Sequence, residues 1–237
     1  MGGAGLRGQS AGETSICTVG VTGSGLTYRG YDVVDLAKNT TFEEVAFLLL
    51  HKKLPNSQEL KEYIEKLKSL RGLQPEMRST LECIPKSAHP MDVLRTGCSV
   101  LGNLEQEESF LNQTDHADRM LSAFPSILSY WYQFSHHGKR IDTETNDDTI
   151  GGHFLHLLHG QKASELHNQV MSISLILYAE HEFNASTFAA RVCASTLSDI
   201  HSAVTSAIGT LLKRFKKSIS RRRRFFRSEK RNCSILW

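Results

Sequence analysis

The stretch TFEEVAFLLLHKKLPNSQELKEYIEKLKSLRG, residues 41–72, decides the fold class, because its signals are those of two consecutive helices. Thr41 and Glu44 have the spacing of a capping box and precede an apolar run. Pro55 is predicted to end this first helix, since proline cannot continue the hydrogen-bond ladder, and Asn56 can cap the second helix. The stretch therefore predicts two helices joined by a short turn.

The second of these helices has one apolar face. Its apolar residues recur 3, 4, 7 and 10 positions after the first, which is the spacing of an amphipathic helix, and Gly72 is predicted to stop it. The residues of this face are Leu60, Tyr63, Ile64, Leu67 and Leu70.

Helical signals continue along the rest of the chain. Pro90 lies where a first helical turn tolerates a missing N–H. Residues 115–137 read as one long helix, which is expected to bend near Pro125 and to stop at Gly138. After a polar loop, the chain predicts a helix in residues 149–160, another ending near Tyr178, and a final helical region over residues 186–209.

Before these helices, residues 15–31 have β-prone runs on either side of the turn sequence TGSG, which predicts a small hairpin. The wider GVTGSG stretch, residues 20–25, lacks the lysine and the spacing of a phosphate loop, so a hairpin turn is the preferred interpretation. Helix upon helix with one hairpin predicts a mainly α fold, with a core that extends to about Leu211.

Charge divides the chain into two unlike segments. The net charge of +3 averages an acidic body with a tail, residues 213–237, that carries eleven Lys and Arg against one Glu. Only this tail has the composition for nucleic acid or an anionic membrane. Two other interpretations stay open, namely a disordered appendage and an accident of a shifted reading frame or a premature join after Leu211.

The cysteines indicate a reducing compartment. Their number is odd, they form no C-x-x-C pair, and this argues for free thiols in the cytoplasm. We expect no secretory signal and no transmembrane helix, because the sequence shows neither an apolar region near residue 1 nor a run of about 20 apolar residues. The cysteines are Cys17, Cys83, Cys98, Cys193 and Cys233.

Three motifs carry a family resemblance: SAHPMDVLRTG at 87–97, DDTIGGHFLHLLHG at 147–160 and YAEHEFNASTFAARV at 178–192. On these motifs the sequence resembles the citrate synthase family from about residue 5 to Leu211. Of the branches of that family, it most resembles the 2-methylcitrate synthases. The resemblance implies a two-domain, almost wholly helical homodimer with a large domain and a small domain that closes over acyl-CoA.

On this basis residues 1–211 are expected to form an incomplete large helical domain, with the small domain largely missing, and residues 212–237 a basic, non-homologous tail. The reaction that the resemblance implies is the condensation of propionyl-CoA or acetyl-CoA with oxaloacetate, followed by thioester hydrolysis. It implies no cofactor and no metal, since acyl-CoA is a co-substrate.

That chemistry needs a carboxylate base for the α-proton, a donor for the enolate oxygen and a donor for the ketone. The family supplies an Asp late in the small domain, a His in a GPLHGGAN-like motif and a His in a GFGHPVY-like motif. None of these has a counterpart here, and residues 213–237 contain no Asp and no His. We therefore expect the chain to be catalytically inactive, and no catalytic residue is assigned.

One family motif is present, HEFNAST at residues 181–187. By resemblance His181 is a ligand of oxaloacetate, and its place between two predicted helices suits an anion. The alternative is a buried histidine whose ring bonds to a backbone carbonyl. As alternatives to an enzyme, the chain could be a non-catalytic dimerising subunit or a polyanion-binding module that uses the basic tail.

Two further groups have competing interpretations. His153, His156 and His159 recur every three residues, so His153 and His156 could chelate a metal, but no acidic or Cys ligand shares their face and a structural or dimer-contact role is preferred. Asp92 and Arg95 are interpreted as a helix-start charge and its ion-pair partner, with a direct substrate role as the alternative.

Overall fold

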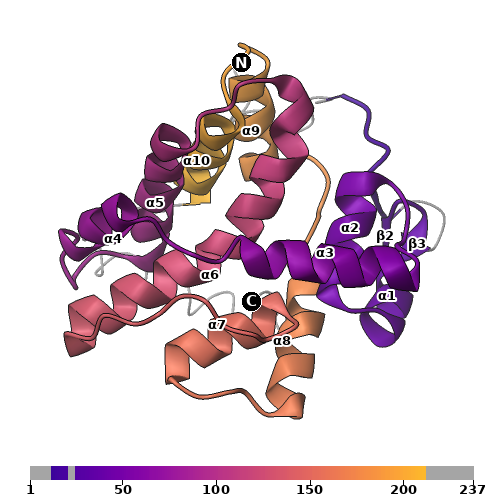
Figure 1. Ribbon diagram of the computed structural model, residues 1–237. Helices are drawn as coiled ribbons and strands as arrows, with labels where there is room; N and C mark the ends of the chain where they lie inside the picture. Colours follow the sequence, from indigo (N-terminus) through magenta and orange to yellow (C-terminus); the bar gives the residue numbers. More distant parts are fainter. Residues whose placement is uncertain (1–11, 21–24, 212–237) are drawn as a thin grey trace, which may run out of the picture.

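The structure, a computed structural model, describes residues 12–20 and 25–211 (Figure 1). It is mainly helical with a small sheet near its start, as the sequence predicts. The strands are β1 Cys17–Val19, β2 Leu26–Tyr28 and β3 Tyr31–Asp32. The helices are α1 Val33–Asn39, α2 Phe42–His51, α3 Ser57–Ser69, α4 Pro75–Glu82, α5 Pro90–Leu104, α6 Gln113–His137, α7 Ile150–His159, α8 Glu165–Tyr178, α9 Ala185–Ala194 and α10 Ile200–Leu211. A 3₁₀ turn, η1 Phe110–Asn112, precedes α6.

The pair α2 and α3 forms as its caps predict. Thr41 Oγ1 accepts from the Glu44 N–H, while the Glu44 carboxylate accepts from the Thr41 N–H, and Asn56 makes the equivalent box with Glu59. The predicted stop at Pro55 is wrong in detail. The helix α2 ends at His51 because Lys52 adopts a left-handed conformation with φ 70°, and its N–H closes the last turn onto Leu48.

The predicted hairpin is the first part of a three-stranded antiparallel sheet in the order β1-β2-β3. The register pairs Cys17 with Tyr28 and Thr18 with Thr27. The predicted turn falls mostly on residues 21–24, which lie outside the described residues. Cys17 and Tyr28 are both buried, so one face of the sheet packs into the interior.

The interior consists of two apolar clusters. The first joins the sheet, α1, α2 and α3 to Ile150 of α7 and Ile176 of α8. The second joins α4, α5, α6 and α10 and includes Ile208, which confirms that the core extends almost to Leu211. The helix α6 contacts helices of both groups and lies between them in Figure 1.

The later helices agree with the predictions in part. The helix α6 runs through Pro125 and ends at Gly138, whose φ of 66° is the left-handed cap expected there. The single final region is instead two helices, α9 and α10, with Leu197 at φ 63° in the link between them. The short helices α1 and α4 were not predicted, although Asp32 caps α1 and Pro75 begins α4.

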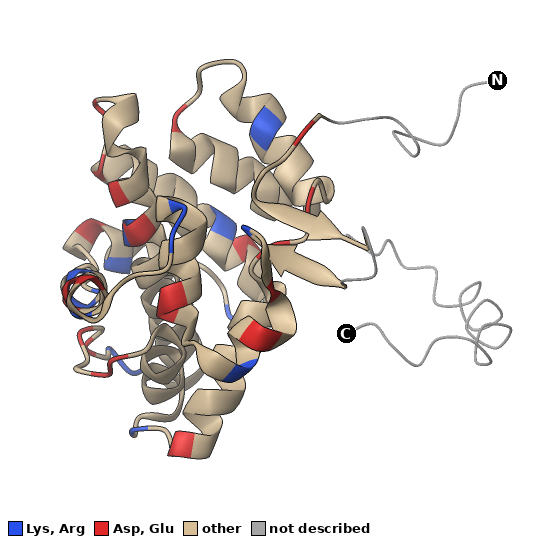
Figure 2. Ribbon diagram, turned by 90° about the vertical axis from the view of Figure 1, so that its right-hand side faces the viewer, with Lys and Arg blue, Asp and Glu red and all other residues tan. Residues whose placement is uncertain are grey.

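On the described helices, Lys and Arg residues are interspersed with Asp and Glu residues (Figure 2). The basic tail, residues 213–237, lies outside the described residues, so its proposed binding of polyanions stays a prediction. Within residues 12–20 and 25–211, none of the helices combines the length and the apolar character that a membrane span requires.

Candidate substrate-binding site

The HEFNAST motif forms the link from α8 to α9 and the first turn of α9. The helix α8 ends at Tyr178, and α9 begins at Ala185 because the Asn184 side chain accepts hydrogen bonds from the N–H groups of Ser186 and Thr187, each 3.0 Å away. An asparagine that caps in this way fixes where the helix starts. The link therefore delivers His181 to a point just before a helix N-terminus.

His181 is exposed in this link. Its backbone N–H donates to the Glu180 carboxylate over 3.0 Å. The alternative of a buried histidine is therefore wrong, because the extended link leaves the imidazole at the surface. An exposed imidazole beside the positive end of a helix dipole is suited to hold a carboxylate.

The link is also bonded to the N-terminal sheet. The Tyr28 hydroxyl donates to the Ile176 carbonyl over 2.8 Å and accepts from the Glu180 N–H over 3.4 Å. The Val19 N–H donates to Glu182 Oε1 over 2.9 Å. Sequence reasoning missed these residues, since nothing local in the chain marks a contact between segments about 150 residues apart.

Two carboxyl groups flank His181 and shape its electrostatic surroundings. Burial raises the pKa of Glu180, while hydrogen bonds from the backbone N–H groups of His181 and Glu182 oppose that rise. Glu182 faces the Val19 N–H, as described above. An anion at His181 must therefore be held by the imidazole and the start of α9 against two neighbouring acids.

The next residues order the first turns of α9. The Arg191 guanidinium lies over the Phe183 ring, 4.6 Å from its centroid, so two residues of the motif region pack on each other. This contact joins the link to the seventh residue of α9 and limits how far the link can swing.

The other predicted groups lie elsewhere. His153 is buried, and its two ring nitrogens lie 3.0 Å from the Ser126 and Thr145 hydroxyls. His156 Nδ1 lies 2.7 Å from Asp147 Oδ2 instead, and His159 is exposed. Within the described residues, no group of three or more His, Cys, Asp or Glu side chains is placed to hold a metal. The buried contacts of His153 and the half-buried contact of His156 fit the structural role.

Asp92 and Arg95 form the ion pair that their spacing predicts, with 2.8 Å between Asp92 Oδ1 and Arg95 Nη2. Asp92 lies in the first turn of α5, where a negative charge is favourable. Arg95 also lies near α10, with its Cδ 3.9 Å from the point where Gly209 would carry a Cβ. Both residues therefore have local structural partners, and a substrate role stays a prediction.

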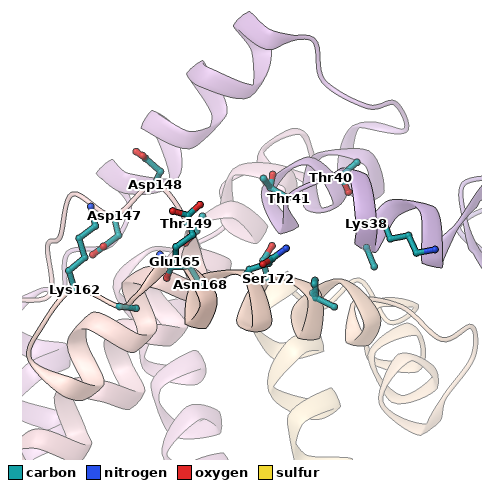
Figure 3. Close-up of a pocket in the computed structure, with 14 residues that line it drawn as sticks. Lys38, Thr40, Thr41, Asp147, Asp148, Thr149, Lys162, Glu165, Asn168 and Ser172 are labelled. Carbon is teal, nitrogen blue, oxygen red and sulfur yellow. The ribbon is translucent and has the colours of Figure 1, made fainter.

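A separate open cavity of about 630 Å³ lies between the α1–α2 junction, the 147–149 loop and α8. Lys38 and Lys162 lie at opposite ends of it (Figure 3). Two of its acids already have partners, because Asp147 contacts His156 and Asp148 pairs with Lys68 over 2.6 Å. His181 does not line this cavity.

Comparison with known proteins agrees with this architecture. The family described as citrate synthase, C-terminal domain, matches residues 5–214. A 2-methylcitrate synthase of Shewanella oneidensis is 69% identical over 88% of this chain and 56% of its own length. A 2-methylcitrate synthase of Mycobacterium tuberculosis is 40% identical over 87% of this chain and 53% of its own length.

Solved structures give the same result. The citrate synthase of Thermotoga maritima has a TM-score of 0.77 and 35% identity, over 89% of this chain and 56% of that one. The citrate synthase of Thermoplasma acidophilum, solved in a ternary complex with carboxymethyl coenzyme A and oxaloacetate, has a TM-score of 0.80 and 26% identity, over 87% of this chain and 55% of that one. The chain spans about half the length of the relatives it matches.

Proposed function

The chain belongs to the citrate synthase family. We propose that its function is part of the acyltransferase reaction in which propionyl-CoA or acetyl-CoA condenses with oxaloacetate. The 2-methylcitrate reaction, with propionyl-CoA, is favoured by the 69% identity to a 2-methylcitrate synthase. Within that reaction, we assign the chain the binding of oxaloacetate, with His181 as its ligand.

The observation that carries this assignment is the exposed His181 at the start of α9. Oxaloacetate carries two carboxylates and a ketone oxygen, all of which accept hydrogen bonds. An imidazole N–H can donate to one of them, and the positive end of α9 favours the negative charge. Because the Asn184 side chain already accepts from the Ser186 and Thr187 N–H groups, α9 contributes the positive end of its dipole, and the imidazole N–H is the proposed direct donor.

The condensation itself needs more than this site. A base must remove the α-proton of the thioester, and donors must hold the enolate and ketone oxygens. After His201 the printed sequence contains neither His nor Asp. We therefore propose that these 237 residues alone bind oxaloacetate without turning it over.

Binding is tested by titrating oxaloacetate into the purified chain in a calorimeter. Replacement of His181 by Ala is expected to weaken binding about tenfold, which corresponds to the loss of about 1.4 kcal/mol. His159→Ala is the matched control, because His159 is also exposed but lies at the end of α7. Equal affinities of the wild-type chain and the His181→Ala variant would show that His181 is no ligand.

Turnover is tested separately by measuring free CoA release from propionyl-CoA and from acetyl-CoA in the presence of oxaloacetate. We expect no release above the rate without protein. Appreciable release of CoA would contradict the proposed inactivity, and the faster substrate would then identify the acyl preference.

A dimerising subunit is a second candidate, favoured by exposed apolar side chains on α8. Leu166, Val170 and Leu177 are 47–65% exposed and follow one another at helical spacing on one face. A homodimer would cover them. Val170→Glu should then shift the mass measured by light scattering from dimer to monomer, while Leu111→Glu, on η1, should leave it unchanged. A monomeric wild-type chain would exclude this candidate.

The free cysteines favour the cytoplasm as the location of the protein. Cys17, Cys83, Cys98 and Cys193 are unpaired thiols in the structure. Unpaired thiols persist in reducing compartments.

A further inference from the structure

The hydroxyl of Tyr28 is used twice in the contact between the sheet and the His181 link. Tyr28 is fully buried, its O–H donates to the Ile176 carbonyl near the end of α8, and its oxygen accepts the Glu180 N–H. The carbonyl and the N–H belong to the last turn of α8 and to the residue just before His181. One side chain thus fixes both the end of the helix and the beginning of the link.

Glu182 fixes the other side of His181. Its φ of 55° is a left-handed conformation, which is strained for a residue with a side chain. The bond of its carboxylate to the Val19 N–H stabilises that conformation from β1. Since β1 pairs with β2, Val19 and Tyr28 belong to the same antiparallel sheet.

We propose that Tyr28 and Glu182 are positioning residues, through which the N-terminal sheet sets the place and orientation of His181 for substrate binding. Neither side chain is proposed to touch the substrate. The proposal rests on the proposed role of His181 as an oxaloacetate ligand. It adds a function for the small sheet, whose three short strands otherwise contribute only two fully buried side chains to the core.

The affinity for oxaloacetate depends on the fraction of molecules in which the link has the conformation that binds. Without the contacts to the sheet, the link can take other conformations, and the apparent dissociation constant rises in proportion to the competent fraction that is lost. Loss of either contact is expected to weaken oxaloacetate binding roughly 3–10-fold. It should also change the surroundings of the His181 ring before any ligand is added.

The experiment compares four variants of the full chain. Tyr28→Phe removes the hydroxyl and keeps the ring, and Glu182→Ala removes the carboxylate. Glu182→Gln keeps an Oε1 acceptor for the Val19 N–H and is the conservative rescue. Thr27→Val is the matched control, because Thr27 lies beside Tyr28 in β2 but its hydroxyl bonds to Thr18 within the sheet.

Two quantities are measured for each variant: the NMR signals of the His181 imidazole without ligand, assigned from their loss in His181→Ala, and the dissociation constant of oxaloacetate. Tyr28→Phe and Glu182→Ala should each shift or broaden the His181 signals and weaken binding. Thr27→Val should resemble the wild-type chain in both measurements. Glu182→Gln keeps the contact with Val19 and removes a repelling charge, so it should bind oxaloacetate at least as tightly as the wild-type chain.

Unchanged His181 signals in folded Tyr28→Phe and Glu182→Ala would overturn the positioning proposal. The two variants act from opposite ends of the link, so that if one of them fails to fold the other decides the question. The proposed function fails in a different way: oxaloacetate binding would then be indifferent to His181→Ala, whatever the NMR signals of the other variants show.

Discussion

The imidazole of His153 in α7 is hydrogen-bonded to the hydroxyl of Ser126 in α6, with 3.0 Å between Nε2 and Oγ. Its other nitrogen bonds to Thr145 in the preceding loop. One neutral histidine thus joins two helices and a loop. Two hydroxyl partners satisfy the ring without a metal or a charge, because each hydroxyl can donate or accept as the tautomer requires.

This burial makes stability depend on the charge of His153. Burial, assisted by nearby Arg71, lowers the pKa of His153 to about 3. As the pH falls from about 6.5 towards 3, the unfolded chain takes up a proton at this residue and the folded chain does not. The free energy of unfolding should therefore decrease on acidification, by up to about 1.4 kcal/mol per pH unit from this group.

Urea denaturation between pH 7 and pH 4 measures this dependence. His153→Gln should flatten it, while His159→Gln, with an exposed side chain on the same helix, should keep the wild-type slope. An identical slope in the His153→Gln variant would show that another group causes the acid sensitivity.

Glu43 of α2 caps α7 from outside. Its Oε1 accepts from the Ile150 N–H over 2.8 Å, and the side chain is buried. Glu43→Ala should lower the free energy of unfolding by about 1–3 kcal/mol, because it leaves a buried N–H without an acceptor. Glu43→Gln keeps the oxygen and removes the charge, so most of the loss should be recovered in chemical denaturation. If Gln were as damaging as Ala, the bond to Ile150 would not be the cause.

Gly97 allows α5 to approach α6 closely. A Cβ at Gly97 would lie 2.6 Å from Ile127 Cγ2, so Gly97→Ala forces the two helices apart and should cost about 1–3 kcal/mol. Gly209 in α10 is the matched control, because a Cβ there meets its nearest neighbour, Arg95 Cδ, only at 3.9 Å.

Gly209→Ala should instead raise the free energy of unfolding by about 0.5–1 kcal/mol, since alanine is the better helix former. Thermal melts of both variants give the comparison. Similar shifts of Tm in the two variants would contradict the close approach at Gly97.

Asp118 of α6 is a fully buried carboxylate that contacts two residues of α3. Tyr63 Oη donates to Oδ1 over 2.8 Å and Lys66 Nζ lies 2.7 Å from Oδ2. Lys66→Met should cost about 3–5 kcal/mol, because it leaves a buried charge without its counter-charge. Lys53→Met, which breaks the exposed pair with Glu59, should cost less than about 1 kcal/mol in the same urea titration. Equal losses would show that Asp118 does not need Lys66.

Much of the fold was predictable because its signals are local. The capping boxes at Thr41 and Asn56, the proline at the start of α5 and the glycine after α6 each act within one or two helical turns. The short helices α1 and α4 were missed because seven or eight residues carry too little periodicity to reveal a face. The break between α9 and α10 was missed because Leu197 takes a conformation that its type does not favour.

By itself, the sequence determined the mainly helical class, most helix starts and the motif that places His181 between two helices. Only the tertiary structure decided that His181 is exposed, that Tyr28 and Glu182 join its link to the sheet, and that His153 is a buried connector. The physical reason is range: caps and apolar periodicity act between residues a few positions apart. The contact of Tyr28 with Glu180 spans 152 residues and exists only once both segments have packed against the same core.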